Sequence, residues 1–139
     1  MVRYLLLVLI NIFICGSFIA PAFGATVVSL VAVLASPSEL QGQEVSVSGV
    51  LGTAENGKTA LYLDHGSYEN AIAANGIAII TTVDGVGNLS LEQLQKLNGK
   101  YVFVVGTLDA SAPKSLFSTR ITQVKTLRSY PLLQALPSN

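Results

Sequence analysis

The 139-residue chain has one cysteine, one histidine and no tryptophan, and these shortages argue against several kinds of chemistry. A protein zinc site needs three or four ligands, most often Cys and His, and the acids here are mostly scattered singly. A single cysteine also allows no disulfide within the chain, so the fold has to be stable through its core alone. We therefore expect no metal and no cofactor, and we favour a non-enzymatic protein.

Charge is scarce as well. Charged residues make up 12% of the chain and the formal net charge is zero, with no block of like sign. Such a chain does not attract polyanions over a distance. Single-stranded nucleic acid also needs a cationic groove with stacking aromatic rings, and only six aromatic residues follow position 24. We therefore expect no nucleic-acid partner.

The N-terminal segment has the features of a secretory signal peptide. Arg3 is followed by the apolar run 5–14, then by Pro21 and by the small residues Ala22 and Gly24. This arrangement predicts a signal peptide over residues 1–24 that is removed on export, and a retained anchor is the alternative. The expected location is periplasmic or secreted, and the expected contact with the membrane is transient.

Cys15 leaves a second alternative open. A lipoprotein signal uses such a cysteine as the lipidated first residue, but it needs a small residue just before it, and here Ile14 stands there. Lipidation at Cys15 is therefore the less favoured interpretation. It would tether the protein to a membrane.

The remaining residues suit one domain, over 25–130, with a loosely held tail over 131–139 that contains two prolines. Within this domain, two segments match each other at a spacing of 57 positions, residues 40–51 (LQGQEVSVSGVL) and 97–108 (LNGKYVFVVGTL). Each follows a short helical pattern, for which Ser36 and Ser90 are predicted N-caps. The match is equally consistent with a duplication and with convergence on one favourable turn.

Glycines divide the repeated unit into parts. Gly42 and Gly99 are predicted to end the two helices in the left-handed conformation, which glycine adopts without steric cost. Alternating valines then begin a strand in each copy. Gly49 and Gly106, inside these strands, predict a bulge or a sharp bend.

Alternation predicts five strands, over residues 45–54, 58–64, 77–83, 101–108 and 119–127. Asn56-Gly57 predicts a hairpin between the first two, and a slip in spacing between Ile121 and Val124 predicts a bulge in the last. Residues 27–35 are interpreted as a short strand running into a helix. The fold class is mainly β with short helices: an OB-like five-stranded Greek-key barrel, with one helix before the first strand and another before the fourth.

The phrase "short helix, Gly, x, x, Val, x, Val, x, Gly", together with LYL, YEN and LNGKYVFVVGTLDA, resembles small exported bacterial OB-fold-like domains of uncharacterised function. The resemblance covers roughly residues 28–127, and its motifs are structural. It therefore implies a fold and not an activity.

The segment 61–76, LYLDHGSYENAIAANG, holds the only histidine together with two tyrosines, two acids and two asparagines. Its candidate ligand-binding residues are Asp64, His65, Tyr68 and Glu69. A structural interpretation is simpler: Ser67 caps a short helix, and Tyr68 packs on the barrel along the same face as Ile72. His65 would then be a solvated loop residue, and the chain would have no catalytic residue.

Three functions remain compatible with the sequence. The favoured one is an exported non-enzymatic binding or interaction module for an unknown protein or small polar ligand. The first alternative is a small envelope hydrolase that uses Asp64, His65, Tyr68 and Glu69. The second is a structural envelope protein anchored through a lipid on Cys15. Tyr62, Tyr101, Phe103 and Phe117 could line one face of the barrel, although a strand Phe is more often a core residue.

We predict signal cleavage between Gly24 and Ala25, because the small residues three and one before this bond follow the apolar run. N-terminal sequencing of the exported protein should therefore begin with Ala-Thr-Val-Val. A mature protein that begins with an acylated Cys15 would contradict this prediction and support the lipid-anchored alternative.

Overall fold

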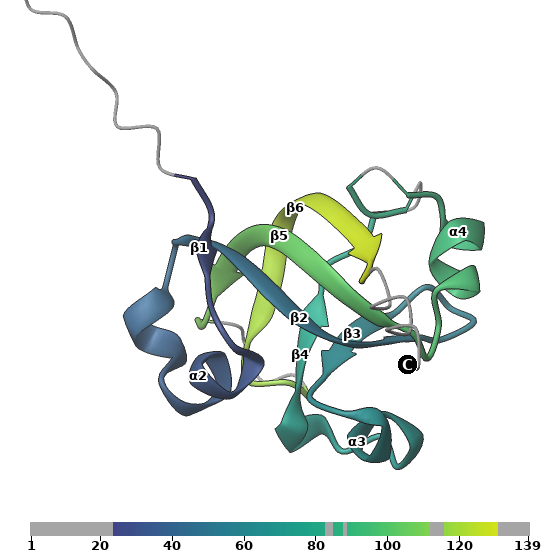
Figure 1. The fold of residues 1–139 in the computed structure, drawn as a ribbon, viewed down its shortest axis with the longest axis horizontal. Coiled ribbons are helices and arrows are strands. Elements are labelled where there is room, and N and C mark those ends of the chain that lie inside the picture. The colour runs from purple at the N-terminus through teal and green to yellow at the C-terminus, as the bar shows by residue number, and fades with distance from the viewer. Residues whose placement is uncertain (1–23, 83–84, 88, 112–115, 131–139) are drawn as a thin grey trace, which may run out of the picture.

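The computed structural model describes residues 24–82, 85–87, 89–111 and 116–130. Five strands form a closed mixed barrel (Figure 1). They are β2 (Glu44–Thr53), β3 (Thr59–Tyr62), β4 (Gly76–Ile79), β5 (Tyr101–Asp109) and β6 (Arg120–Ser129). Around the barrel the order is β2-β3-β4-β6-β5, and β5 pairs back onto β2. Only β4 and β6 run parallel among these five. The predicted fold class is confirmed.

Three short α-helices accompany the barrel: α2 (Leu30–Ala35), α3 (His65–Glu69) and α4 (Leu91–Lys96). One-turn 3₁₀ helices, η1 (Pro37–Leu40) and η2 (Ala73–Asn75), precede β2 and β4. Helices therefore stand before the first and the fourth barrel strands, as predicted. The short strand β1 (Thr26–Val27) pairs with the start of β2 and runs into α2, which confirms the prediction for residues 27–35.

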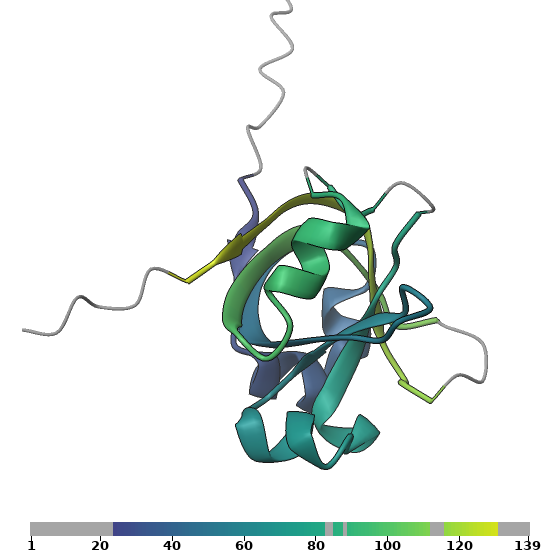
Figure 2. The ribbon, with the colours of Figure 1, turned by 90° about the vertical axis from the view of Figure 1, so that its right-hand side faces the viewer.

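The barrel interior is filled by aliphatic side chains. Alternate residues of β2, β5 and β6 point inward, and Leu30, Val33 and Leu94 of the helices complete the same cluster. Figures 1 and 2 place α2 and α4 on opposite sides of the barrel, where each covers part of this core. No helix among the described residues is long and apolar enough to cross a membrane.

All six aromatic residues beyond position 24 lie outside this interior cluster. Tyr62, Tyr68 and Phe117 form one group on the outer surface, and Tyr101, Phe103 and Tyr130 form another. A Phe in a strand is more often a core residue, but Phe103 is not one. It alternates with the inward-pointing Val102 and Val104 and therefore points outward.

The two matching segments are related in space by an approximate twofold axis. β2 and β5 pair antiparallel, and their register sets Val47 opposite Val104, its own counterpart in the repeat. Every other pair then follows the same symmetry, so that Gly49 lies opposite Val102 while Gly106 lies opposite Val45. The repeat is therefore a feature of the fold as well as of the sequence.

Equivalent loops close the two ends of this strand pair. Gly42 and Gly99 both adopt a φ of +74°, as predicted. The amide of Gly42 donates to the carbonyl of Leu108 (2.8 Å), and the amide of Gly99 donates to the carbonyl of Leu51 (2.7 Å). The amides of Leu108 and Leu51 in turn donate to the carbonyls of Gln43 (2.9 Å) and Lys100 (3.0 Å).

A third hydrogen bond is duplicated through a side chain. Gln41 Oε1 accepts from the amide of Ala110 (2.6 Å), and Asn98 Oδ1 accepts from the amide of Thr53 (2.8 Å). The two acceptors, Gln41 and Asn98, are separated by the repeat spacing of 57, and so are the two donors, Thr53 and Ala110. Each loop that starts one strand therefore holds the end of the other strand with three hydrogen bonds.

One local prediction needs correction. Ser36 makes no side-chain cap, because η1 begins at Pro37 in 3₁₀ form; Ser90 does form a full capping box with Gln93. The hairpin predicted at Asn56-Gly57 is confirmed: Ala54 pairs with Lys58 around a three-residue loop, in which Gly57 takes a positive φ (80°).

The two strand glycines have different roles. Gly106 faces the register shift between β5 and β6, where Gln123 has a φ of 47°, and this irregularity confirms the bulge predicted between Ile121 and Val124. Gly49 has no bulge in its pairing with β5. A Cβ there would lie 2.5 Å from the carbonyl oxygen of Tyr62, so glycine is needed for the close approach of β2 and β3.

We predict that Gly42→Val lowers the free energy of unfolding by roughly 1–2 kcal/mol, the cost of a left-handed conformation for an L-residue. No atom lies within 4 Å of the Cβ position at Gly42, so this cost is conformational and not steric crowding by neighbours. Gly42→Asn is the matched control and should cost less, because Asn tolerates this region better. Equal urea midpoints for the parent and Gly42→Val would contradict the prediction.

Candidate functional site

A groove lies on the outer face of β2 and β3, where the aromatic group of Tyr62, Tyr68 and Phe117 lines it. Its volume is about 610 Å³. Its walls come from the β2–β3 hairpin, α3, the loop before β5 and the segment before β6. The lining residues are Gly52, Thr53, Ala54, Lys58, Thr59, Ala60, Tyr62, Tyr68, Glu69, Asn98, Leu116 and Phe117.

The groove continues across β3 onto β4. A second hollow of about 370 Å³ shares Lys58, Thr59, Leu116 and Phe117 with the first. It extends along Ala78 to Thr81 and ends beside Arg120. The two hollows therefore adjoin each other over three neighbouring strands.

Three aromatic rings give the groove its shape. Tyr62 is central, with Tyr68 at 6.1 Å and Phe117 at 6.0 Å between ring centroids. Both neighbours are steeply inclined to it, at 67° and 69°, which is the edge-to-face arrangement that aromatic pairs favour. Burial of Tyr62, and then the nearby Tyr68 hydroxyl, raise the pKa of the Tyr62 phenol, so this hydroxyl stays protonated and neutral at pH 7.

Two glycines make room for this aromatic group. A Cβ at Gly52 would lie 2.7 Å from Cε2 of Tyr62, and a Cβ at Gly76 would lie 3.0 Å from Cε1 of Phe117. Since real Cβ contacts are longer than the first of these distances, a side chain at Gly52 would displace the Tyr62 ring. Gly52 of β2 and Gly76 of β4 thus leave the space that the rings of Tyr62 and Phe117 occupy.

Near the rings lie polar side chains that have no hydrogen-bond or ion-pair partner among the described residues. The Thr53 hydroxyl is buried and has no hydrogen-bond partner among the described residues. Lys58 and Glu69 are exposed, and in the part of the chain that the structure describes neither forms an ion pair. Donors and acceptors are therefore both available beside an aromatic floor.

Asp64 has a structural role at the start of α3. Its carboxylate accepts a hydrogen bond of 2.7 Å from the amide of Ser67, and this bond is the main reason that the pKa of Asp64 is lowered. The prediction that Ser67 caps the helix is wrong, because Asp64 caps it three residues earlier. Ser67 is instead buried, and its hydroxyl accepts from the side chain of Asn75.

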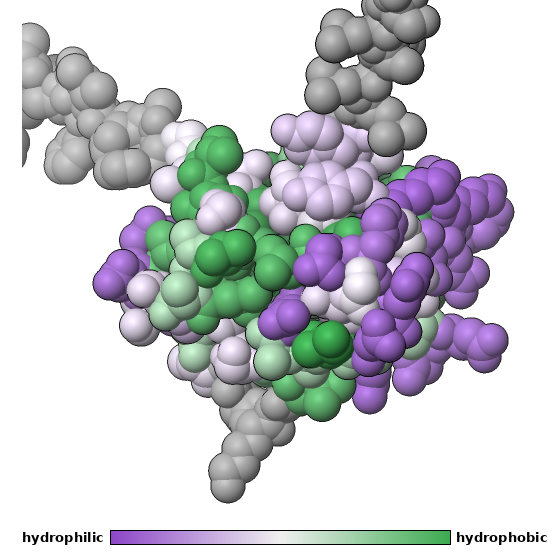
Figure 3. All heavy atoms as spheres, turned by 60° about the horizontal axis from the view of Figure 1, so that its bottom comes forward, coloured by the Kyte–Doolittle hydropathy of each residue, from purple (hydrophilic) through white to green (hydrophobic). Residues whose placement is uncertain are grey.

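The helix ends at Glu69, before Ile72, so the prediction that Tyr68 and Ile72 share one helix face is wrong. Asn70 is its C-cap and Ala71 has a φ of 48°, which turns the chain away from the helix axis. Ile72 is therefore 41% exposed and does not share the packed face of Tyr68. Figure 3 shows the surface on this side of the molecule, which is apolar over α2 and hydrophilic toward α3 and α4.

The four candidate residues divide into two pairs. Tyr68 and Glu69 line the groove, whereas Asp64 and His65 are not among its lining residues. His65 is exposed at the first position of α3. Across the described ranges, no three or more His, Cys, Asp or Glu side chains gather closely enough to hold a metal ion.

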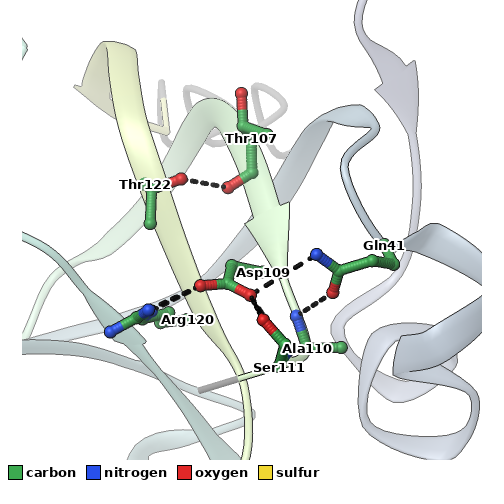
Figure 4. Close-up of polar contacts among 7 residues, drawn as sticks. All are labelled: Gln41, Thr107, Asp109, Ala110, Ser111, Arg120 and Thr122. Carbon is green, nitrogen blue, oxygen red and sulfur yellow. Dashed lines mark hydrogen bonds and ion pairs between the residues drawn. The ribbon is translucent and has the colours of Figure 1, made fainter. Parts of the chain in front are cut away.

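A polar network that the sequence did not suggest joins the end of β5 to the start of β6 (Figure 4). Asp109 accepts from the amide (2.9 Å) and hydroxyl (2.6 Å) of Ser111 and from Nε of Arg120 (2.7 Å). Gln41 joins this network through Asp109 and the amide of Ala110. The network ties the end of β5 to the start of β6, close in sequence to Leu116 and Phe117.

The bonds from Ser111 and then Arg120 hold the pKa of Asp109 well below its usual range. The residues Asp109, Ser111 and Arg120 give a weak sequence signal, an Asp two residues before a Ser at a strand end. Their pairing across the loop depends on the β5–β6 register, which the sequence pattern alone does not reveal.

Comparison with known proteins gives no family. No family model matches this sequence, and no curated protein matches it. Among solved structures, a DUF3299 family protein from Pseudomonas aeruginosa is similar over 77% of this chain and 97% of its own, with a TM-score of 0.48 and 13% identity.

A putative aspartyl-tRNA synthetase from Leishmania major is similar over 81% of this chain, with a TM-score of 0.47 and 16% identity. This chain covers only 22% of that protein. At these scores and identities, neither structure indicates what this chain binds.

We predict that Asp109→Asn destabilises the protein at pH 7 and that this difference shrinks as the pH falls. A folded-state pKa below the unfolded value of about 3.9 contributes stability above that value, and the contribution is lost as the pH falls through the folded-state pKa. Urea unfolding of parent and variant between pH values of about 7 and 2 tests this.

Glu92→Gln is the matched control, because it removes the exposed ion pair with Lys96 on the surface of α4. Exposed pairs of this kind contribute little to stability, so the control should show little difference from the parent at any pH. A gap between parent and Asp109→Asn that stays constant down to pH values of about 2 would contradict the role assigned to Asp109.

Proposed function

We propose that this protein is an exported, non-enzymatic binding module whose ligand lies in the groove on the outer face of β2, β3 and β4. The observation that carries the proposal is the groove itself. It joins three aromatic rings with the exposed side chains of Lys58 and Glu69, which form no ion pair among the described residues, in two adjoining hollows. Export rests on the features of residues 1–24, of which 1–23 lie outside the described residues.

The packing of the barrel supports this location. Its interior is filled by buried aliphatic side chains, so it offers no room for a ligand. The groove, by contrast, is an open hollow of about 610 Å³ on the outside of the barrel. Concave sites with apolar walls and a few polar groups are the usual form of a ligand site.

The division of the four candidate residues favours a binding module over a hydrolase. General acid–base or nucleophilic catalysis needs its side chains to converge on one reacting atom. Asp64 is engaged as a helix cap, and His65 lies outside the lining of the groove. Tyr68 and Glu69 remain as binding residues in this proposal. The lipid-anchored alternative depends on Cys15, outside the described residues.

Photo-crosslinking in the producing cells tests the proposal even while the ligand is unidentified. A photoreactive benzoylphenylalanine replaces Phe117 in the full chain, and an adduct found by mass spectrometry is expected. The matched control places the same group at Tyr101, in the second aromatic cluster, which is also partly exposed. Adding His65→Ala should leave the adduct yield at position 117 unchanged.

Equal yields of adduct at positions 117 and 101 would contradict the proposal that the ligand binds specifically in the groove. An adduct at position 101 alone would contradict it too. Loss of the adduct on His65→Ala would instead return Asp64 and His65 to the site and favour the hydrolase.

A further inference from the structure

We infer that Asn56, at the tip of the β2–β3 hairpin, is a site of spontaneous deamidation, and that the fold protects the chemically matched Asn98 from the same reaction. The inference concerns a covalent modification and goes beyond the proposed function. It starts from a tripeptide that the sequence contains twice, Asn-Gly-Lys, at residues 56–58 and again at 98–100. The chain therefore carries the same reactive sequence in two different surroundings.

Deamidation of asparagine is an intramolecular reaction with the backbone. The nitrogen of the following residue loses its proton to hydroxide and attacks Cγ of the asparagine side chain, whose own nitrogen takes a proton from water and leaves as ammonia. The new N–Cγ bond closes a succinimide ring, and water opens this ring at either carbonyl to give aspartate or isoaspartate. Glycine favours the attack because it has no Cβ to obstruct the approach.

Exposure and local conformation do not distinguish the two sites. Both asparagines are exposed, and both glycines are left-handed, with a φ of 80° at Gly57 and 74° at Gly99. At each site the glycine amide donates one hydrogen bond and Oδ1 of the asparagine accepts one. The difference lies in the partners of these bonds.

At Asn98 both bonds reach another strand. The amide of Gly99 donates to the carbonyl of Leu51 (2.7 Å), and Oδ1 of Asn98 accepts from the amide of Thr53 (2.8 Å). Leu51 and Thr53 belong to β2, and these bonds are part of the set that holds β2 against β5. Attack of the Gly99 nitrogen on Cγ would break both bonds. It therefore requires this end of the barrel to open, which costs more free energy than the motion of an exposed loop.

At Asn56 both bonds stay inside the hairpin loop. The amide of Gly57 donates to the carbonyl of Ala54 (2.9 Å), and Oδ1 of Asn56 accepts from the amide of Lys58 (3.1 Å). The bond from Lys58 folds the carboxamide forward along the chain, toward the Gly57 nitrogen that attacks it. Ala54 and Lys58 are themselves exposed, so water can replace these bonds without the opening of a packed strand.

The third Asn-Gly pair, Asn75-Gly76, is held by packed structure as well. Gly76 is buried at the start of β4, pairs with Tyr62 of β3, and donates its amide to the carbonyl of Ala73. The side chain of Asn75 donates to the hydroxyl of the buried Ser67 (3.1 Å). We therefore expect this pair to react slowly too.

The modification changes the charge beside the groove. Either product places a carboxylate at position 56, next to Glu55 and two residues before Lys58, which lines the groove. Isoaspartate also carries the backbone through the former side chain, which lengthens the exposed loop between β2 and β3. An aged molecule therefore has one more negative charge at this end of the groove than a newly made one.

Incubation of the purified full chain at mildly alkaline pH, followed by tryptic peptide mapping, tests the inference. Trypsin cuts after Lys58, Lys96 and Lys100, so the three Asn-Gly pairs fall in three different peptides. Position 56 should convert at least about tenfold faster than position 98, a ratio that corresponds to about 1.4 kcal/mol in the cost of local opening. The product should contain isoaspartate as well as aspartate, and its rate of formation should rise with pH.

Two controls separate the effect of the fold from that of the local sequence. In denaturing guanidinium chloride, positions 56 and 98 should convert at similar rates, because both precede Gly-Lys. In the native chain, Asn56→Gln should remove the product from the peptide that ends at Lys58, since glutamine closes such a ring far less readily. This variant replaces an exposed loop side chain, so it should leave the fold intact and the other two peptides unchanged.

A native ratio of rates closer to the ratio in guanidinium chloride than to tenfold would overturn the inference, because the fold would then give Asn98 no protection. Faster conversion at Asn98 or Asn75 than at Asn56 would overturn it as well. So would a product at Asn56 that is aspartate alone, since opening of the succinimide ring yields both isomers.

Discussion

The structure depends on two equivalent loops, each of which begins one strand of the barrel and holds the end of the other. A left-handed glycine, Gly42 or Gly99, turns the chain from helix to strand so that its amide meets a leucine carbonyl of the opposite strand. Three hydrogen bonds per loop then fix β2 against β5 in a single register. Because β2 and β5 are the strands that close the barrel, the rest of the sheet follows from this pair.

The same loops position the proposed site. Asn98 holds Thr53 at one wall of the groove, and its counterpart Gln41 holds Ala110 at the start of the segment that leads to Phe117. Asp109 and Arg120 join the end of β5 to the start of β6. A repeated structural device therefore holds the ends of both β2 and β5, while the groove itself is not repeated, since the second aromatic cluster lies on a different part of the surface.

The barrel was predictable from the sequence because its signals are local. Alternating valines, Gly42 and Gly99, and the slip after Ile121 all appear within a few residues of the feature that they predict. The cap of α3 was misassigned because Asp64 and Ser67 both suit an N-cap, and only the exit of the chain from β3 decides between them. Tyr68 and Glu69, two of the four candidate residues, line the groove, but the sequence had no signal that Leu116 and Phe117 would line it with them. Contacts of that kind depend on the closure of the barrel.

The central claim is that the outer groove, and not the polar start of α3 or the second aromatic cluster, is where this protein binds. Amide chemical-shift mapping of the ¹⁵N-labelled mature protein against a library of small polar and aromatic fragments tests it most directly. The claim predicts that shifts gather on Gly52–Ala60 of the hairpin, on Tyr68 and Glu69, and on Leu116 and Phe117. Shifts that gather instead around His65, or around Tyr101 and Tyr130, would contradict it.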